Sequence, residues 1–410
     1  MKSVGVILAT LVLPFSLAQA ADWPQWRGAN FDGIAEAQVP KSLPETLPVS
    51  WTANVGTGFS SFAAVGNRVL TMGNKDDRDS VWCLDAQTGK VLWQHVYDCP
   101  LDPLYYEGGP GGTPTVHGGS VYTLSKKGHA FRLSLETGKV IWSRDLLADH
   151  GLELPEWSFA GSPFVHEGRV ILNAGRGGIA LSANTGETLW LPDTETSGYA
   201  TIVPFQENQH LLFSAKALLS INLSDGSQHW EFPWKSSRDV NAADPLVIGN
   251  DIVVSSSSGT MRIRPVRGQS DPDVVWEQKD LKWYFNPGVR VGNYIYSLHG
   301  TTHRPTELVC TDVETGATVW AEEGFGSGGL IASGDHVIVF DLGKLTIFPA
   351  SPDGFEPILQ LQVLDGKCWT APVIANGLIF CRNAVGDIAA VKLPSAGQDG
   401  TTVSLRSPDR

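Results

Sequence analysis

The chain alternates short apolar runs with turns built on glycine. The stretch CLDAQTGKVLW (Cys83–Trp93) contains an apolar strand, a polar Thr-Gly turn and a second strand that ends in tryptophan. Similar stretches end at Trp142, Trp190, Trp230 and Trp320. Alternation with period two predicts β-strands, and glycine between two such runs predicts a hairpin because it adopts positive φ at little cost.

These units repeat along most of the chain. A weaker copy ends in Trp276, so neighbouring repeat tryptophans from Trp93 onward lie 40 to 49 residues apart. A second template, small-Pro-x-Val followed by a short turn, marks inner hairpins that start near residues 61, 113, 162, 201, 244, 287, 329 and 371. A period in the forties with four strands per unit is typical of a propeller. We expect an all-β fold, an eight-bladed β-propeller with four-stranded antiparallel blades.

The ring is expected to be closed by an N-terminal strand. The eighth inner hairpin is followed by one strand only, Ile388–Leu393, and Val49–Val55 supplies the missing outer strand, which removes an open edge. In the seventh blade, Ile358 or Leu359 takes the tryptophan position. The expected organisation is a signal peptide (1–20), an N-terminal segment and linker (21–48), the propeller (49–394) and a disordered tail (395–410). Residues 22–34 would form a short aromatic and glycine-rich lead into the ring.

Large flat side chains suit the wedge-shaped gaps between blades. The expected structural repeat residues are Trp51, Trp93, Trp142, Trp190, Trp230, Trp276 and Trp320. Cys83 and Cys310, each ten residues before a tryptophan, are expected to be buried thiols, as is Cys381 in an inner strand. Cys99 and Cys368 fall in connections near the ring closure and form the one candidate disulfide.

The N-terminal 20 residues and the charge limit the location and the partners. Residues 1–20 have one lysine, an apolar run and the ending Ala18-Gln19-Ala20, which predicts a secretory signal peptide cleaved after Ala20. The residue directly after that point is Ala21 and not cysteine, so we expect no lipid anchor. We also expect no membrane span, and a periplasmic or secreted monomer. The net charge of −13 without a basic cluster argues against nucleic acid as a partner.

Loop lengths predict which rim of the ring functions. Turns inside the hairpins are short, whereas several blade-to-blade connections on the opposite rim are long and rich in aromatic and charged residues. Variable loops on a rigid scaffold often bind ligands. The candidate binding residues are Tyr106, Glu107, Trp157, Arg238, Trp283, Tyr284 and Trp369. The alternative is that these side chains only hold their own loops onto the ring.

The repeat small-x-Asp/Ser-x-x-Thr-Gly-x-x-x-Trp resembles that of pyrroloquinoline-quinone (PQQ)-type propellers. That family includes quinoprotein alcohol dehydrogenases, the propeller lipoprotein of the outer-membrane barrel-assembly machinery, and exported PQQ-like repeat proteins without an assigned role. The segment DWPQWRG followed by Asp-Gly also resembles the N-terminus of the last group. The resemblance implies an eight-bladed ring and leaves the activity open, because the repeat tryptophans build the blades.

An enzyme of this family would need two adjacent cysteines under the cofactor, a Ca²⁺ ion held by Glu, Asn and Asp, and an Asp base. No two cysteines are adjacent here, and the acidic run Asn74–Asp79 lacks the glycine and terminal glutamate of known calcium loops. We therefore interpret that run as a solvated turn and expect no metal site. The leading hypothesis is an envelope binding or scaffolding module for a protein, peptide or small ligand. The alternative is a PQQ-dependent, alcohol dehydrogenase-like oxidoreductase with calcium.

Overall fold

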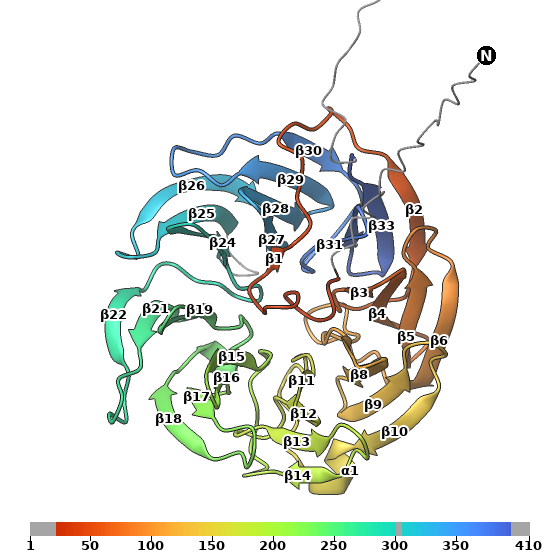
Figure 1. Ribbon diagram of the computed structural model, residues 1–410, viewed down its shortest axis with the longest axis vertical. Coiled ribbons are helices and arrows are strands. Elements are labelled where there is room, and N and C mark those ends of the chain that lie inside the picture. The colour runs from red at the N-terminus through yellow and green to blue at the C-terminus, as the bar shows by residue number, and fades with distance from the viewer. Residues whose placement is uncertain (1–21, 301–305, 395–410) are drawn as a thin grey trace, which may run out of the picture.

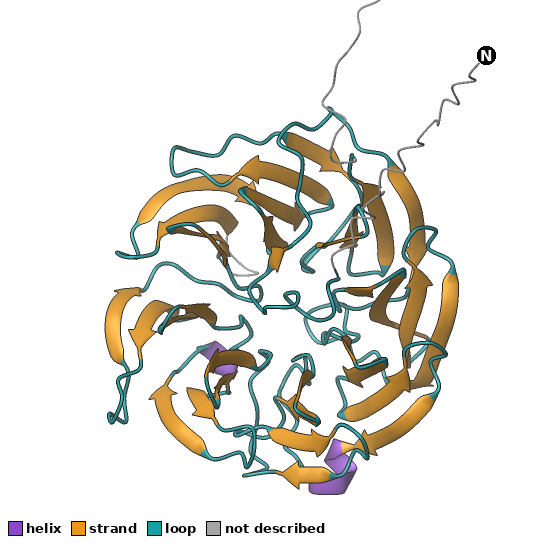
Figure 2. Cartoon of the chain, in the orientation of Figure 1, coloured by secondary structure: helices purple, strands orange, loops and turns teal. Residues whose placement is uncertain are grey.

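The computed structural model describes residues 22–300 and 306–394; the expected signal peptide and tail lie outside them. Eight antiparallel sheets surround a central axis, as Figure 1 shows, which confirms the eight-bladed propeller. Almost all regular structure is strand (Figure 2), apart from α1 (Leu146–His150) and the short 3-10 turn Ser237–Asp239. No helix in these residues is long and apolar enough to cross a membrane.

Each blade contains four antiparallel strands, numbered outward from the axis. Blades 1 and 2 contain β3 (Ala63–Val65), β4 (Arg68–Lys75), β5 (Arg78–Asp85), β6 (Val91–Asp98), β7 (Thr115–His117), β8 (Ser120–Leu124), β9 (His129–Ser134) and β10 (Val140–Asp145). Blades 3 and 4 contain β11 (Phe164–His166), β12 (Arg169–Leu172), β13 (Ile179–Ser182), β14 (Thr188–Trp190), β15 (Val203–Gln206), β16 (Gln209–Phe213), β17 (Ala217–Ile221) and β18 (Gln228–Pro233).

Blades 5 and 6 contain β19 (Leu246–Ile248), β20 (Asp251–Ser256), β21 (Gly259–Arg264), β22 (Asp273–Gln278), β23 (Val289–Val291), β24 (Tyr294–His299), β25 (Thr306–Asp312) and β26 (Thr318–Phe325). Blades 7 and 8 contain β27 (Gly329–Ser333), β28 (His336–Asp341), β29 (Lys344–Pro349), β30 (Leu359–Gln362), β31 (Val373–Ala375), β32 (Leu378–Arg382), β33 (Asp387–Lys392) and β2 (Val49–Asn54). Blade 7 also gains β1 (Ile34–Ala35), which pairs in parallel with β27.

The N-terminal strand closes the ring as expected. β2 pairs antiparallel with β33, with Trp51 opposite Ala390. In blade 7 the tryptophan position is taken by Leu359, which pairs with Ile347 and is buried. Both results follow from the period-two pattern, because a strand that continues a blade must match the inward and outward alternation of its neighbour.

The repeat tryptophans join each blade to the next. Six of the seven donate their indole Nε1–H over 2.9 Å to a carbonyl oxygen in the outer hairpin of the following blade. The exception is Trp230, which donates to Gln209 Oε1 of its own blade. Blade 5, which follows it, has Arg267-Gly268 in its outer turn, where blades 1 to 4, 6 and 7 have Thr-Gly or Asp-Gly. The motif therefore specifies an interface between blades as well as a turn.

A bulge precedes nearly every repeat tryptophan. In the pairing of β5 with β6, for example, Cys83 lies opposite Trp93 and Leu84 lies opposite Val91, so Leu92 is skipped. The skipped position leaves Leu92 exposed on the outer edge. Bulges twist an edge strand and disfavour pairing with another chain, which suits the free outer edges of the blades.

The small-Pro template builds the wall around the axis. Thr113 and Ser162, which precede the prolines of blades 2 and 3, act as acceptors for the previous blade: Ser61 N donates to Thr113 Oγ1 at 3.0 Å and Thr113 N to Ser162 Oγ at 2.9 Å. The series continues from Ser162 N to Thr201 Oγ1 and from Thr201 N to Asp244 Oδ1. In blades 2 to 5, a hydroxyl or carboxylate residue at this position therefore links each blade to the one before it.

The N-terminal segment corrects one expectation. Residues 22–35 do more than lead into the ring: they lie at its centre, where β1 appears in Figure 1. Trp23 and Arg27 are only 3% and 5% exposed, and Trp23 exchanges two 2.7 Å backbone hydrogen bonds with Ala64. The chain then crosses one rim of blades 7 and 8 and becomes β2. Glycine-rich sequence without periodicity gave no sign that this segment is buried.

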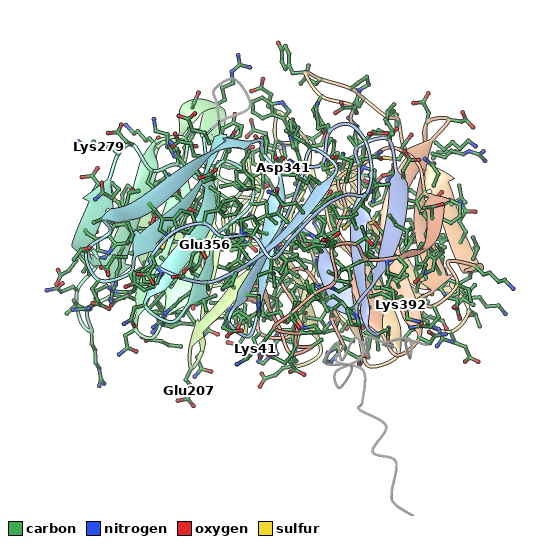
Figure 3. All side chains as sticks on the ribbon, turned by 90° about the horizontal axis from the view of Figure 1, so that it is seen from above. Lys41, Glu207, Lys279, Asp341, Glu356 and Lys392 are labelled. Atoms are coloured by element: carbon green, nitrogen blue, oxygen red, sulfur yellow. The ribbon has the colours of Figure 1, made fainter. Side chains whose placement is uncertain are left out.

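The two rims differ as predicted. In Figure 3, Glu207 of a hairpin turn and Lys41 of the N-terminal strap lie at one rim, and Lys279 and Asp341 lie toward the other. We call the second the long-connection rim; it carries residues 99–114, 146–163, 234–245, 279–288 and 363–372, which join successive blades.

Candidate functional site

Aromatic side chains from four connections (55–62, 99–114, 279–288 and 363–372) form a continuous cluster on the long-connection rim. The ring of Trp369 lies 5.3 Å from that of Phe59 and 5.0 Å from that of Phe285. Phe59 also contacts Tyr106, and Phe285 contacts Tyr284 at 4.4 Å. All five side chains are partly exposed. Burial raises the pKa of Tyr106 to about 12, so its phenol is a neutral hydrogen-bonding group at physiological pH.

A second group surrounds Arg238. Its guanidinium carbon lies 5.9 Å from the ring centres of both Tyr105 and Trp157, and Nη1 donates to Glu156 Oε1 at 3.2 Å. Trp157 also contacts Tyr199, whose ring centre is 6.3 Å away. Groups from three connections therefore meet at Arg238.

Glu107, the other charged candidate, pairs with a lysine. Lys367 Nζ lies 2.8 Å from Glu107 Oε2 and 4.3 Å from the ring centre of Trp369. The two charged candidates, Glu107 and Arg238, each have their own partner of opposite charge. Both ion pairs are partly exposed, so each contributes little to stability by itself, about 0–1 kcal/mol.

The backbone of this rim contains left-handed residues other than glycine. Asp102, Tyr105, Ser158, Arg238 and Asp239 have φ between 53° and 68°. Such conformations are disfavoured for residues with a Cβ and often gather at functional sites.

Trp283 is a correction. It was expected on the rim, but it is 0% exposed and packs with Trp276 and Ile295 in the core between blades 5 and 6. Its backbone N–H donates to Ser255 Oγ at 2.9 Å. The connection folds inward at this residue and outward again at Tyr284, a reversal that depends on the cavity between two blades and not on the local sequence.

The acidic run Asn74–Asp79 is only partly a solvated turn. Asp76 and Asp77 are exposed, but Asp79 is fully buried and accepts a 2.7 Å hydrogen bond from Asn74 Nδ2. Burial raises the pKa of Asp79. The reason is the alternation of β5, which turns Asp79 toward the interior.

The cysteines do not pair. All five are free and buried, so the candidate disulfide between Cys99 and Cys368 is not formed. Cys99 lies beside Asp79 between the first two blades, whereas Cys368 packs in the cluster that includes Cys381 of blade 8. Burial raises the pKa of both Cys99 and Cys368 to about 12, which keeps the thiols protonated and unreactive. Cys83, Cys310 and Cys381 are buried as expected.

The centre of the ring is filled by the N-terminal segment. Trp26 Nε1 donates to Asp244 Oδ2 at 2.6 Å, and Arg27 Nη2 donates to Gly288 O at 3.0 Å. Burial raises the pKa of Asp244 to about 6, and the neighbouring Arg27 opposes this shift. The cavity that remains at this point has about 10 Å³, the space of one water molecule.

Sequence reasoning missed several residues of the rim. Glu156 adjoins Trp157, Tyr105 adjoins Tyr106, and Lys367 lies two residues before Trp369. The signal that could have identified them is that they share a long connection with a candidate residue. Phe285 likewise adjoins the candidate Tyr284. Phe59 and Tyr199 had no signal beyond aromatic type, because neighbours in a propeller come from separate blades.

Comparison with known proteins relates the chain to two kinds of propeller. A sequence profile of the family described as outer membrane protein assembly factor BamB matches residues 77–322. The protein of that name from Xanthomonas campestris pv. campestris is 26% identical over 218 residues, which cover 52% of this chain and 48% of the relative. The chain thus spans about half the length of this relative. A polyvinylalcohol dehydrogenase from a Pseudomonas species is 25% identical over 180 residues, which cover 42% of this chain and 26% of the enzyme.

Solved structures share the fold. BamB from Moraxella catarrhalis superimposes with a TM-score of 0.64 at 15% identity, over 85% of this chain and 98% of that chain. Quinohemoprotein alcohol dehydrogenase from Comamonas testosteroni gives a TM-score of 0.67 at 13% identity, over 92% of this chain and 81% of that chain. The fold therefore does not distinguish an assembly factor from a dehydrogenase.

Proposed function

Because this chain belongs to the family of the outer membrane protein assembly factor BamB, we propose that it acts as a binding and scaffolding module of the cell envelope. In this proposal an envelope protein, peptide or small ligand binds the long-connection rim. The carrying observation is that six connections bring partly exposed aromatic and charged side chains together there, around an axis that the chain's own N-terminal segment fills.

The proposed contact residues are Tyr106, Glu107, Trp157, Arg238, Tyr284 and Trp369. Their aromatic rings offer flat anchors with little side-chain entropy to lose, and such residues dominate binding energies at interfaces. Trp283 leaves the set because it is buried. The charged members set the orientation of a partner more than its affinity.

The location and partner class belong to the same proposal. We infer a monomer in the periplasm or outside the cell, in line with the expected signal peptide. The assembly role in the relatives' name motivates an envelope protein as the first partner to test.

A PQQ-dependent oxidoreductase is the second candidate, favoured by the similarity to polyvinylalcohol dehydrogenase. The residues fit the implied quinone and calcium poorly. The five cysteines lie in separate elements, and within 22–300 and 306–394 no three His, Cys, Asp or Glu side chains gather as metal ligands. The enclosed cavity beside Trp26 and Arg27 has only about 10 Å³, against about 300–1,000 Å³ for small-molecule sites. A larger open hollow of about 380 Å³ lies by Asp22 and His117, and no cysteine lines it.

The test is capture of envelope proteins by the purified full chain and by rim variants. Trp157→Ala and Trp369→Ala should each weaken capture of the same identified partner about tenfold or more, as expected for aromatic anchors. Asn250→Ala, in a short turn of the opposite rim, is the matched control and should capture like the parent. Melting temperatures are measured for all four proteins.

Two outcomes would contradict the proposal. One is loss of capture with Asn250→Ala but not with the rim variants, which would move the site to the other rim. The other is a chromophore and dye reduction with an alcohol after addition of PQQ and Ca²⁺, which would favour the oxidoreductase.

A further inference from the structure

Two basic side chains on the long-connection rim occupy chemically similar places. Arg238 lies against the rings of Tyr105 and Trp157, at 5.9 Å from each, and is hydrogen bonded to Glu156. We call Tyr105, Trp157 and Glu156 the first seat. It combines two aromatic faces with one carboxylate around a guanidinium.

The second seat is formed by Trp369 and Glu107. Lys367 Nζ lies 4.3 Å from the ring centre of Trp369 and 2.8 Å from Glu107 Oε2. This ring and this carboxylate come from different connections. A carboxylate beside at least one aromatic ring therefore contacts a basic side chain twice on one rim.

We propose that both seats are recognition sites for the basic side chains of a polypeptide ligand, and that Arg238 and Lys367 fill them only in its absence. The ligand class is a segment with two basic residues, arginine above all. This inference rests on the proposed binding function of the rim and narrows the partner. It changes the role of Arg238 from a contact that orients the ligand to a competitor that the ligand displaces.

The chemistry of the seats favours a cation. Aromatic faces attract cations, and a carboxylate beside them adds a charge-assisted hydrogen bond. Arginine fits best because its planar guanidinium can stack on a ring while its edge donates to a carboxylate. An apolar or acidic ligand that displaced Arg238 or Lys367 would leave Glu156 or Glu107 without a partner.

The first seat is open to exchange. Tyr105 is 81% exposed, and the side chains of Arg238 and Glu156 are 57% and 43% exposed. Exposed ion pairs contribute little free energy, so a ligand can displace Arg238 from Glu156 at low cost. Arg238 and Asp239 also have left-handed backbones, with φ of 55° and 56°, and movement of this connection would relieve that strain.

The net charge of the whole chain also favours a basic ligand. The net charge is −13, so a basic ligand is attracted at long range and an acidic one is repelled. If the seats act in this way, binding should weaken as salt rises, because the attraction between exposed charges is screened.

Isothermal titration calorimetry with blocked peptides tests the inference. The probes are three short peptides of one sequence that carry two arginines, two citrullines or two glutamates; citrulline keeps the shape of arginine without its charge. The full chain should bind the arginine peptide about tenfold or more tightly than the others. Arg238→Gly, which empties the first seat and suits the left-handed backbone, should tighten binding about threefold to tenfold, and Glu156→Gln should weaken it about tenfold.

Arg144→Ala is the matched control, since Arg144 forms a partly exposed ion pair with Asp149 of α1, which lies at the outer edge of the ring in Figure 1. It should leave binding unchanged. Lys367→Ala repeats the test at the second seat, with tighter binding expected. Weaker binding of the arginine peptide to Arg238→Gly, or equal binding of all three peptides, would overturn the inference. If no peptide binds while the rim variants still lose a captured envelope protein, the inference fails and the proposed function stands.

Discussion

At the scale of the residue, the Thr-Gly…Trp motif recurs because its glycine and the preceding blade's tryptophan meet. A Cβ added to Gly138 would lie 2.5 Å from the indole of Trp93, and the corresponding glycines of four other blade junctions would come within 2.6–2.8 Å. The turn also needs positive φ, which is 69° at Gly138. Two separate constraints therefore fix one residue type.

Gly138→Ala and Gly249→Ala separate these constraints. Gly249 has a similar φ of 61° but no atom within 4 Å of its added Cβ. We expect Gly249→Ala to cost about 1–2 kcal/mol from backbone strain and Gly138→Ala to cost about 1–3 kcal/mol more from the overlap with Trp93. Denaturant unfolding measures both. Equal losses of unfolding free energy would mean that the indole of Trp93 moves aside at no cost.

At the scale of the element, the N-terminal segment lies along the central axis and links several blades through hydrogen bonds. It bonds to Ala64 of blade 1, Asp244 of blade 5, Gly288 before blade 6 and Ala332 of blade 7. Short inner strands make few contacts across the axis, so the segment supplies links that the blades do not make directly. Asp244 is the link that depends on pH.

Asp244→Asn should change how stability depends on pH. Because burial raises the pKa of Asp244 from 3.8 to about 6, the folded protein holds this proton more tightly than the unfolded chain. The contribution of Asp244 to stability is then full below about pH 4 and falls as the pH rises to 6. The free energy of unfolding of the parent, relative to Asp244→Asn, should drop by about 3 kcal/mol between pH 4 and pH 7. Parallel pH curves for the two proteins would contradict this assignment.

At the scale of the whole molecule, one stretch closes the ring twice. Residues 22–35 occupy the axis, and β2 completes blade 8 at the periphery, where it pairs with β33. The strap between them is tied to blade 7 through Val39 N, which donates to Ser333 Oγ at 2.9 Å. Figure 1 follows this path from the centre to the outer edge. Closure protects the ring from the open edge that would otherwise invite aggregation.

Two deletions test this double closure. Removal of 22–56 should abolish soluble monomer, because it exposes sheet edges and opens the axis. Removal of 22–35 alone leaves β2 in place but takes out Trp23 and Arg27, and should lower the free energy of unfolding by about 3 kcal/mol or more. Size-exclusion chromatography and denaturant unfolding provide the measurements. If a protein without residues 22–35 has the same free energy of unfolding as the parent, then this segment does not stabilise the ring at its axis.

The sequence by itself determined the propeller, the eight blades, the closing strand (predicted at Val49–Val55) and the positions of the repeat tryptophans, because these follow from alternation and period along the chain. Only the tertiary structure decided that Trp23 and Arg27 fill the axis, that Trp283 points inward, that Cys99 and Cys368 stay apart, and that Arg238 and Lys367 rest in aromatic seats. Each of these depends on contacts between blades or connections far apart in sequence, and local pattern carries no information about which distant loops meet once the ring has closed.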